Sequence, residues 1–534
     1  MRRHPSYAGR TVAALAGWVA AQAQAGPPPG AAPATAGREV FSVLEYRVLH
    51  NTVLPTRQVE SAVYPHLGPG KTIDDVQAAR AALEQAYHAA GYSSVFVDVP
   101  EQSIGEGIVR LSVTEGRVGS LRVSGERYVS GRAIRAAVPS LAPGTVPHFP
   151  DVQQQINDVN RESGDLAVVP VLKAGQTPGT VDVDLKVKDE LPLHGSIEVN
   201  DHNTPDTTRT RVNFSLSYTN LFQTYQSLSL QYQLAPERHS DAGVFSGTYL
   251  IPFSAGGPSL ALYTIKTNSD VAAVGTLSVV GRGEIYGARY IIPLTLGGNL
   301  YQTLTFGGEY KSFGQNVLLV DGGGIQTPIH YLNWTGIYNV SLATPRTRSS
   351  VEIATDFGVR GVANSIDEFE NNRAMAQPNY YYVRLNASHE RVLTHGWSMA
   401  VRLNSQFSAA PLINNEQFAI GGATSVRGYL ESEALGDSGV AAGFELRSPS
   451  LPTLITHGAR EAYGYLFTDG GLVALVDPLP SQTPRTRLWS LGGGMRLTAF
   501  AGLDAELSFA DARLATPYTH AGDYRFLFDV RYGL

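Results

Sequence analysis

Strict alternation of apolar and polar residues is the feature that most constrains the fold of this chain, and it runs through residues 190–534. In the segment SLSLQYQL (residues 227–234), leucine and tyrosine alternate with serine and glutamine. Because successive side chains of a strand point to opposite faces, such a segment has one apolar and one polar face. A soluble sandwich has the same period of two, so alternation predicts sheet without choosing the architecture.

Three further features favour a membrane barrel. The alternating segments continue to the end of the chain, and many are about 9–12 residues long, which is enough for a tilted strand to cross a bilayer. Their polar phase is rich in Ser, Gln, Asn and Arg, as a water-filled lumen requires. We therefore predict an all-β transmembrane barrel over residues 190–534, with about 16 antiparallel strands.

The last segment, DYRFLFDVRYGL, supports the barrel. Its apolar residues share one face: Tyr524, Phe526, Phe528, Val530, Tyr532 and Leu534. A C-terminal strand of this kind resembles the signal by which outer-membrane barrels are recognised for assembly, although Leu534 stands where the usual Phe would be.

The N-terminus predicts export. Arginines precede the apolar run TVAALAGWVA, and a small-x-small pattern ends at Ala25, which is typical of a secretory signal peptide over residues 1–25. The run is much shorter than the roughly 20 residues of a membrane-spanning helix. Residues 26–37 read as a Pro/Ala/Gly linker without a helix. With no cysteine in the chain, an exported protein has no disulfide framework.

Residues 38–189 have mixed α and β character and contain one pattern twice, over residues 38–116 and 117–189. The first copy has the strand FSVLEYRVL, then a helix that begins at Thr72 with a capping-box-like Asp75, and then two strands. Gly91 is placed to end the helix. Four apolar residues fall near one face of this helix: Ile73, Val76, Leu83 and Tyr87.

The second copy has the strand VGSLRVSG, a helix within DVQQQINDVNRES, and two further strands. Val152, Ile156 and Val159 are aligned along this helix. Two unrelated small α+β domains would give the same periodicity, so the pattern by itself leaves that alternative open.

No enzyme class has a signature in this sequence. H-E-x-x-H, G-x-S-x-G and Walker A motifs are all missing, so we predict no catalytic, cofactor-binding or metal-binding residues. The formal net charge of -6 gives no reason to expect binding to nucleic acid.

Two short motifs in the barrel segment carry a family resemblance. SVRGY (Ser425–Tyr429) resembles the VRGY/F signature in the lumenal loop of two-partner secretion transporters (TpsB, the ShlB/FhaC/HecB type) and of the related BamA barrel-assembly proteins. FTDGG (Phe467–Gly471) resembles the F-x-D-x-G pattern on a strand of the same barrels. Residues 158–187 also look like the end of the second POTRA domain of TpsB proteins. The candidate site residues are Val426, Arg427, Gly428, Tyr429, Phe467, Asp469 and Gly471.

The resemblance implies two periplasmic POTRA domains (38–116 and 117–189) and an outer-membrane barrel (190–534) with a lumenal loop around 411–437. It implies that Arg427 pairs with Asp469, that Gly428 allows a tight turn and that Tyr429 packs the tip of the loop. The predicted function is export of a haemolysin-like or adhesin-like partner protein, captured in an extended state by the POTRA domains and passed through a barrel that we expect to be monomeric.

Two rival functions share parts of this architecture. A barrel-assembly factor would have the same barrel and loop motif, but such proteins usually carry more POTRA repeats. A passive porin or receptor would leave residues 38–190 and the predicted ion pair without a function. An incidental Arg427 in a surface turn is the remaining alternative for the motif.

Overall fold

The structure is a computed structural model that describes residues 40–533 except 105, 255, 269–270, 275–276, 281, 296–297, 319–323, 452–458 and 500–501. The predicted signal peptide, the linker and Leu534 lie outside the described residues. The chain divides into two compact units. The first contains the described residues up to Ser124 with Val138–Ile156 and Val169–Lys186, and the second contains Gly125–Ala137, Asn157–Val168 and Val187 onward. The second repeat contributes to both units, so its predicted boundaries stay a prediction.

The first repeat combines two helices with two small sheets. Its elements are β1 (Phe41–Val43), β2 (Glu45–Leu49), α1 (Thr56–Val63), η2 (Tyr64–His66), β3 (Gly68–Lys71), α2 (Ile73–Ala89), β4 (Val95–Asp98) and β5 (Ile108–Glu115). The predicted single strand over residues 41–49 is wrong, because β1 pairs with β3 whereas β2 pairs in parallel with β5. The chain changes partner at Leu44, whose side chain is exposed. Helix α1 was not predicted; it starts after Pro55 without a side-chain cap.

Helix α2 supplies the apolar core of this repeat. The Thr72 and Asp75 side chains form the predicted capping box, and Gly91 follows the helix end with φ +93°. Leu83 and Tyr87 are fully buried in a cluster with the β4 and β5 strands. Ile73 does not share this face as predicted, because at the first position of the helix its side chain is 55% exposed.

We predict that a fragment of residues 38–190 folds without the barrel and unfolds in one cooperative, mixed α/β thermal transition. Leu83→Ala removes fully buried methyl groups and should lower the free energy of unfolding by about 2–5 kcal/mol. Ile73→Ala, in the same helix, should have little effect because the side chain is exposed. Circular dichroism on the three fragments measures the difference; a disordered wild-type fragment would contradict the prediction.

The second repeat has the same strand topology. Its elements are β6 (Arg117–Ser124), α3 (Gly131–Ala137), η3 (Pro139–Leu141), α4 (Phe149–Glu162), β7 (Leu166–Ala174) and β8 (Thr180–Asp189). The sheet order β6-β8-β7 matches β2-β5-β4 of the first repeat, with the first strand of each parallel to the last. Val152, Ile156 and Val159 of α4 are buried, as predicted. This shared topology favours a repeat over two unrelated domains.

The end of β8 is fixed by its last side chain. Burial disfavours ionisation of Asp189, but hydrogen bonds from the backbone N–H groups of Tyr128, Arg127 and Val129 outweigh it and hold its pKa below the usual value. No helix among the described residues has the length and apolar character needed to cross a membrane.

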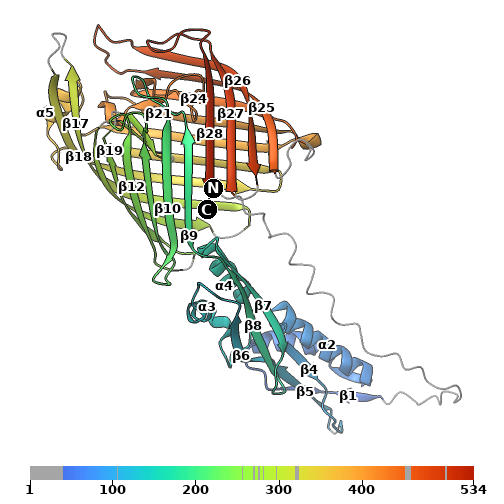
Figure 1. Cartoon of the computed structure of the whole chain (residues 1–534). Helices are drawn as coiled ribbons and strands as arrows, with labels where there is room; N and C mark the ends of the chain where they lie inside the picture. Colours follow the sequence, from blue (N-terminus) through green and yellow to red (C-terminus); the bar gives the residue numbers. More distant parts are fainter. Residues whose placement is uncertain are drawn as a thin grey trace. The chain divides into compact units, whose positions relative to one another are not determined.

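Residues from Leu193 onward form a closed barrel of 16 strands, which confirms the predicted number. The strands are β9 (Leu193–Asn200), β10 (Arg211–Leu221), β11 (Gln226–Leu234), β12 (Gly243–Pro252), β13 (Ser259–Thr267), β16 (Arg282–Thr295), β17 (Leu300–Leu318), β18 (Gly324–Ala343), β19 (Thr347–Gly358), β20 (Tyr381–Val392), β21 (Ser398–Ser408), β24 (Ser438–Arg447), β25 (Ala459–Ala474), β26 (Arg485–Ala499), β27 (Leu503–Ala512) and β28 (Tyr524–Gly533). All neighbours are antiparallel, and β28 closes the barrel against β9 (Figure 1).

The alternation seen in the sequence separates the two faces of this barrel. Large apolar side chains such as Phe214, Leu216 and Leu228 are 38–50% exposed on the outer face. Tyr524 and Phe526 of the final strand are likewise exposed, whereas the alternate residue Leu527 is buried. Antiparallel strands that follow one another in sequence alternate in direction. The connections after β19, β21, β25 and β27 therefore lie at the outer rim of the barrel, which is the rim opposite the start of β9.

The connection between β21 and β24, residues 409–437, is folded onto the inner wall. It contains η5 (Asn414–Glu416) and a hairpin of β22 (Phe418–Ile420) with β23 (Ala434–Gly436). Four of its buried residues share one apolar cluster with side chains of β25, β26 and β27: Ile420, Val426, Tyr429 and Ala434 of the connection with Val473, Leu488 and Ala512 of the wall. We call residues 409–437 the lumenal loop.

Candidate functional site

Arg427, in the lumenal loop, is bonded to Asp469 of β25 through both its side chain and its backbone. Arg427 Nε lies 2.7 Å from Asp469 Oδ2, and Nη2 lies 3.1 Å from Oδ1. The backbone N–H of Arg427 adds a third bond of 3.2 Å to Oδ2. Arg427 is 3% and Asp469 1% exposed. Two parallel bonds to one carboxylate are a geometry that a lysine cannot form.

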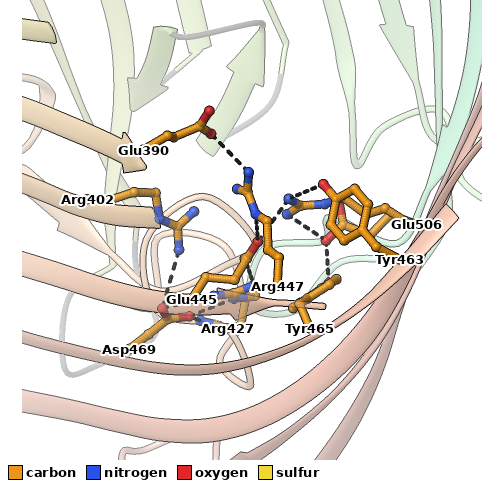
Figure 2. Close-up of polar contacts among 10 residues, drawn as sticks. Glu390, Arg402, Arg427, Glu445, Arg447, Tyr463, Tyr465, Asp469 and Glu506 are labelled. Carbon is orange, nitrogen blue, oxygen red and sulfur yellow. Dashed lines mark hydrogen bonds and ion pairs between the residues drawn. The ribbon is translucent and has the colours of Figure 1, made fainter. Parts of the chain in front are cut away.

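This ion pair is part of a larger network that the sequence did not indicate (Figure 2). Glu445 of β24 accepts bonds from Arg427 Nη1 at 3.0 Å, Arg447 Nε at 2.6 Å and Arg496 Nη1 at 3.0 Å. Asp469 also accepts a 3.3 Å bond from Arg402 of β21. Each carboxylate at the centre therefore contacts more than one guanidinium.

The outer members of the network balance its charge. Arg447 Nη1 lies 3.1 Å from Glu390 Oε1, and Arg496 donates two bonds, of 2.7 and 3.0 Å, to Glu506. The network thus has four arginines and four carboxylates: Arg402, Arg427, Arg447, Arg496, Glu390, Glu445, Asp469 and Glu506. Since a buried charge is costly unless it is paired, this balance makes burial of Arg427 possible.

An aromatic side chain covers the flat face of the same guanidinium. Arg427 Cζ lies 3.5 Å from the centroid of the Phe467 ring, a cation–π contact in a desolvated site. Phe467 is the first residue of the F-x-D-x-G pattern, and its position on β25 puts it in phase with Asp469. The pattern therefore provides both the carboxylate and the ring that hold Arg427.

The glycines of both motifs allow close approach of the loop to the wall. Gly428 has φ +96°, a conformation that favours glycine. At Gly471 a Cβ atom would lie 3.1 Å from Val426 Cγ2 and 3.0 Å from Ile420 Cδ1. Val426 is fully buried at this contact. A larger residue at Gly471 would push the loop away from β25.

Tyr429 fixes the tip of the loop to two further parts of the wall. Its hydroxyl lies 2.8 Å from the carbonyl oxygen of Leu514 and accepts the backbone N–H of Leu514 at 3.1 Å and that of Trp489 at 3.3 Å. The ring is fully buried. All seven candidate residues are thus brought together at one contact between the loop and the wall.

A second attachment holds the first part of the loop to other strands. Glu416 is buried and accepts bonds from Lys311 at 2.7 Å, Tyr331 at 2.6 Å and Tyr382 at 2.6 Å, which belong to β17, β18 and β20. Neither this site nor Glu445 was predicted. In the sequence, Glu416 and Glu445 are recognisable only as charged residues within or beside alternating segments. This pattern does not show which residues they contact. Among the described residues no group of His, Cys, Asp and Glu side chains is arranged to hold a metal ion.

A third attachment joins the end of the loop to the connection between β19 and β20. Asp437 is fully buried and paired with both terminal guanidinium nitrogens of Arg373, Nη1 and Nη2, the Nη2–Oδ2 distance being 2.7 Å. The same carboxylate accepts the backbone N–H of Leu412 at 2.9 Å and that of Val476 at 2.7 Å. Both ends of the loop therefore meet at Asp437.

A closed barrel that holds an internal loop, preceded by small α/β repeats, defines a POTRA-barrel protein. Residues 179–497, more than half of the chain, match the family of haemolysin secretion/activation proteins ShlB/FhaC/HecB, and residues 41–116 match the ShlB-type POTRA domain. The chain therefore belongs to the ShlB/FhaC/HecB family of two-partner secretion transporters. It is an outer-membrane barrel with periplasmic POTRA domains, in a family of transporters rather than enzymes.

The chain is similar to known proteins along most of its length. Outer membrane transporter CdiB from Escherichia coli O6:K15:H31 (strain 536 / UPEC) is 24% identical over 487 residues, which cover 86% of this chain and 77% of that protein. CdiB from Dickeya dadantii (strain 3937) is 22% identical over 452 residues, covering 80% and 76%. Each of these two relatives is therefore similar to this chain in sequence well beyond the short motifs.

Solved structures share the fold. CdiB from Escherichia coli superimposes with a TM-score of 0.64 at 18% identity, over 94% of this chain and 93% of that chain. BamA from Haemophilus ducreyi lacking POTRA domains 1–3 gives 0.56 at 15% identity, over 92% and 100%. The likeness to both proteins extends over the barrel and the preceding repeat region.

The network predicts unequal effects of removing its acidic members. Asp469→Ala removes three bonds from Arg427, whereas Glu445→Ala removes one, so Asp469→Ala should release the loop more. Breaking a buried pair costs about 3–5 kcal/mol. We expect faster hydrogen exchange of backbone amides 421–430 in full-length protein, in the order Asp469→Ala, Glu445→Ala, wild type.

The exposed Arg485 of β26 provides the control for that experiment. Arg485→Ala should leave exchange in residues 421–430 at the wild-type rate. Equal exchange in all four proteins would mean that the ion pairs do not hold the loop.

Proposed function

We propose that this transporter exports one large partner exoprotein, of haemolysin or adhesin type, from the periplasm to the cell surface through its barrel. The observation that carries the proposal is the lumenal loop, which buried ion pairs attach to the inner wall at two sites and to the connection between β19 and β20 at a third. Such a loop blocks free diffusion at rest, and its first part is displaced when cargo passes. A passive porin has no need of it.

The POTRA repeats receive the cargo in an extended state. Their sheets have edge strands, and the backbone groups of an edge can pair with an extended chain with little demand on its sequence. Strands β4 and β7 lie at sheet edges in the two repeats. Because the periplasm lacks ATP and the chain has no nucleotide motif, folding of the exported protein outside the cell supplies the drive.

The proposed function is tested by deleting the gene and comparing the proteins released into the medium. We expect one large protein, encoded nearby, to disappear from the medium while the other outer-membrane proteins keep their amounts. A general loss of outer-membrane proteins would instead indicate a barrel-assembly factor, and an unchanged medium would indicate a porin or receptor.

Capture by the second repeat has its own test. Deleting residues 117–189 should abolish release of the partner but leave a heat-modifiable barrel in the outer membrane, because the barrel strands begin after this segment. Gel mobility with and without heating measures barrel assembly in parallel with release. Continued release by this variant would place recognition in the barrel.

The Arg427–Asp469 pair predicts a non-additive effect on release. Arg427→Ala and Asp469→Ala should each reduce release sharply without preventing barrel assembly, since both break the same contact. The double variant should be little worse than either single variant. Release assays on the three variants, with the amount of barrel measured alongside, test this. Additive losses would show that the two residues act separately.

A further inference from the structure

The charges of the barrel wall are unevenly distributed. Strands β10, β11 and β12 together contain a single charged residue, Arg211, at the first position of β10. The wall residues that bond to the lumenal loop or belong to its ion-pair network, as described above, lie elsewhere, on β17, β18, β20, β21 and β24–β27. One part of the wall is therefore charged and attached to the loop, and another part is neutral.

Most lumen-facing side chains of the neutral part are short hydroxyls and amides; Val244 and Leu250 of β12 are apolar exceptions. They alternate with exposed outer-face residues such as Phe214, Leu228 and Phe245. The register joins them into rows, because Ser215 pairs with Gln231 and Gln231 with Ser246, while Ser217 pairs with Ser229 and Ser229 with Thr248. We call these six residues the neutral wall: Ser215, Ser217, Ser229, Gln231, Ser246 and Thr248.

The lumenal loop leaves the neutral wall uncovered. Gln231 and Thr248 are exposed, and the four serines are partly exposed. By contrast, the wall residues that hold the loop are buried, with Asp469 1% and Glu445 6% exposed. The neutral wall is therefore accessible to solvent, whereas the wall residues that hold the loop are not.

A neutral wall suits the passage of a polypeptide of mixed sequence. A charged side chain in a lumen of lowered dielectric would attract segments of opposite charge strongly and repel those of like charge. An apolar wall would retain apolar segments. Hydroxyl and amide groups both donate and accept hydrogen bonds, so they exchange freely between water and the backbone of a passing chain.

We propose that the neutral wall on β10–β12 is the track along which the exported polypeptide crosses the barrel in an extended state. This inference rests on the proposed export function and adds the route of the exported polypeptide through the barrel. The later part of the loop keeps its attachment through Arg427 to the charged strands while the cargo moves past on the other side.

The track is closed at its outer end in this structure. Val244 of β12 and Ile265 of β13 pack in one buried cluster with Phe369 of α5 (Ile366–Asn372) and with Leu412 and Ile413 of the loop. The connection that carries α5 and the loop both leave the outer rim. Cargo that follows the track must therefore displace α5 together with the first part of the loop.

The test places a photo-crosslinking amino acid at single positions of the full-length transporter, in cells that release the partner identified by the deletion experiment. Positions 229 and 231 report on the track. Position 388 is the matched control, because Ser388 is an exposed serine in the lumen-facing phase of β20, at a similar distance from the periplasmic rim. We expect adducts with the partner at positions 229 and 231 and only background at 388.

Charge insertion gives an independent measurement. Ser229→Arg should cause loss of most of the release, whereas Ser388→Arg should release at the wild-type level, with equal amounts of barrel in the membrane. Adducts at 388 that equal or exceed those at 229, or normal release by Ser229→Arg, would overturn the track while leaving the export function intact. Failure of the partner to depend on the transporter would remove both.

Discussion

The structure depends on one constraint: every backbone N–H and C=O group inside a bilayer must be hydrogen-bonded within the protein. A strand meets it only by pairing on both sides, so the sheet has to close, as β28 closes on β9. In a closed sheet, successive side chains of each strand point alternately toward lipid and toward the lumen. Apolar and polar residues therefore alternate along the strand. At 16 strands the lumen is wide enough to hold an aqueous channel, so something else must limit leakage.

The lumenal loop occupies that space, and electrostatics decide how it can be held there. A loop stabilised by apolar packing alone would have no defined register on a polar wall. The paired charges define this register. The Arg427 guanidinium donates two bonds whose spacing matches the two oxygens of Asp469, and it donates a further bond to Glu445. Since four guanidinium groups face four carboxylates, the network is neutral and buried charges are not left uncompensated.

Local patterns made much of the fold predictable, and long-range contacts account for what was missed. The barrel and its number of strands follow from alternation together with the number, length and polar phase of the strands, and the α2 capping box follows from Thr72 and Asp75. Ile73 was wrongly predicted to lie on the buried face of α2, because the spacing of apolar residues does not show that the first turn of the helix projects beyond the sheet. Family motifs identified Arg427 and Asp469. Glu445 and Glu416 were missed because their side-chain partners other than Arg447 lie 18 to 105 residues away in the sequence, and only the closed sheet brings them together.

The uneven wall explains how one lumen can both hold a loop and conduct a chain. Ion pairs that fix the loop need charged, desolvated strands, whereas a moving polypeptide needs a wetted surface with no strong binding point. These demands conflict on a single surface but not on different strands. Strands β10–β12, which hold none of the loop's ion-pair partners described above, have kept only one charge between them. The loop can then remain attached through Arg427 during transit, so that the barrel closes again when the cargo has left.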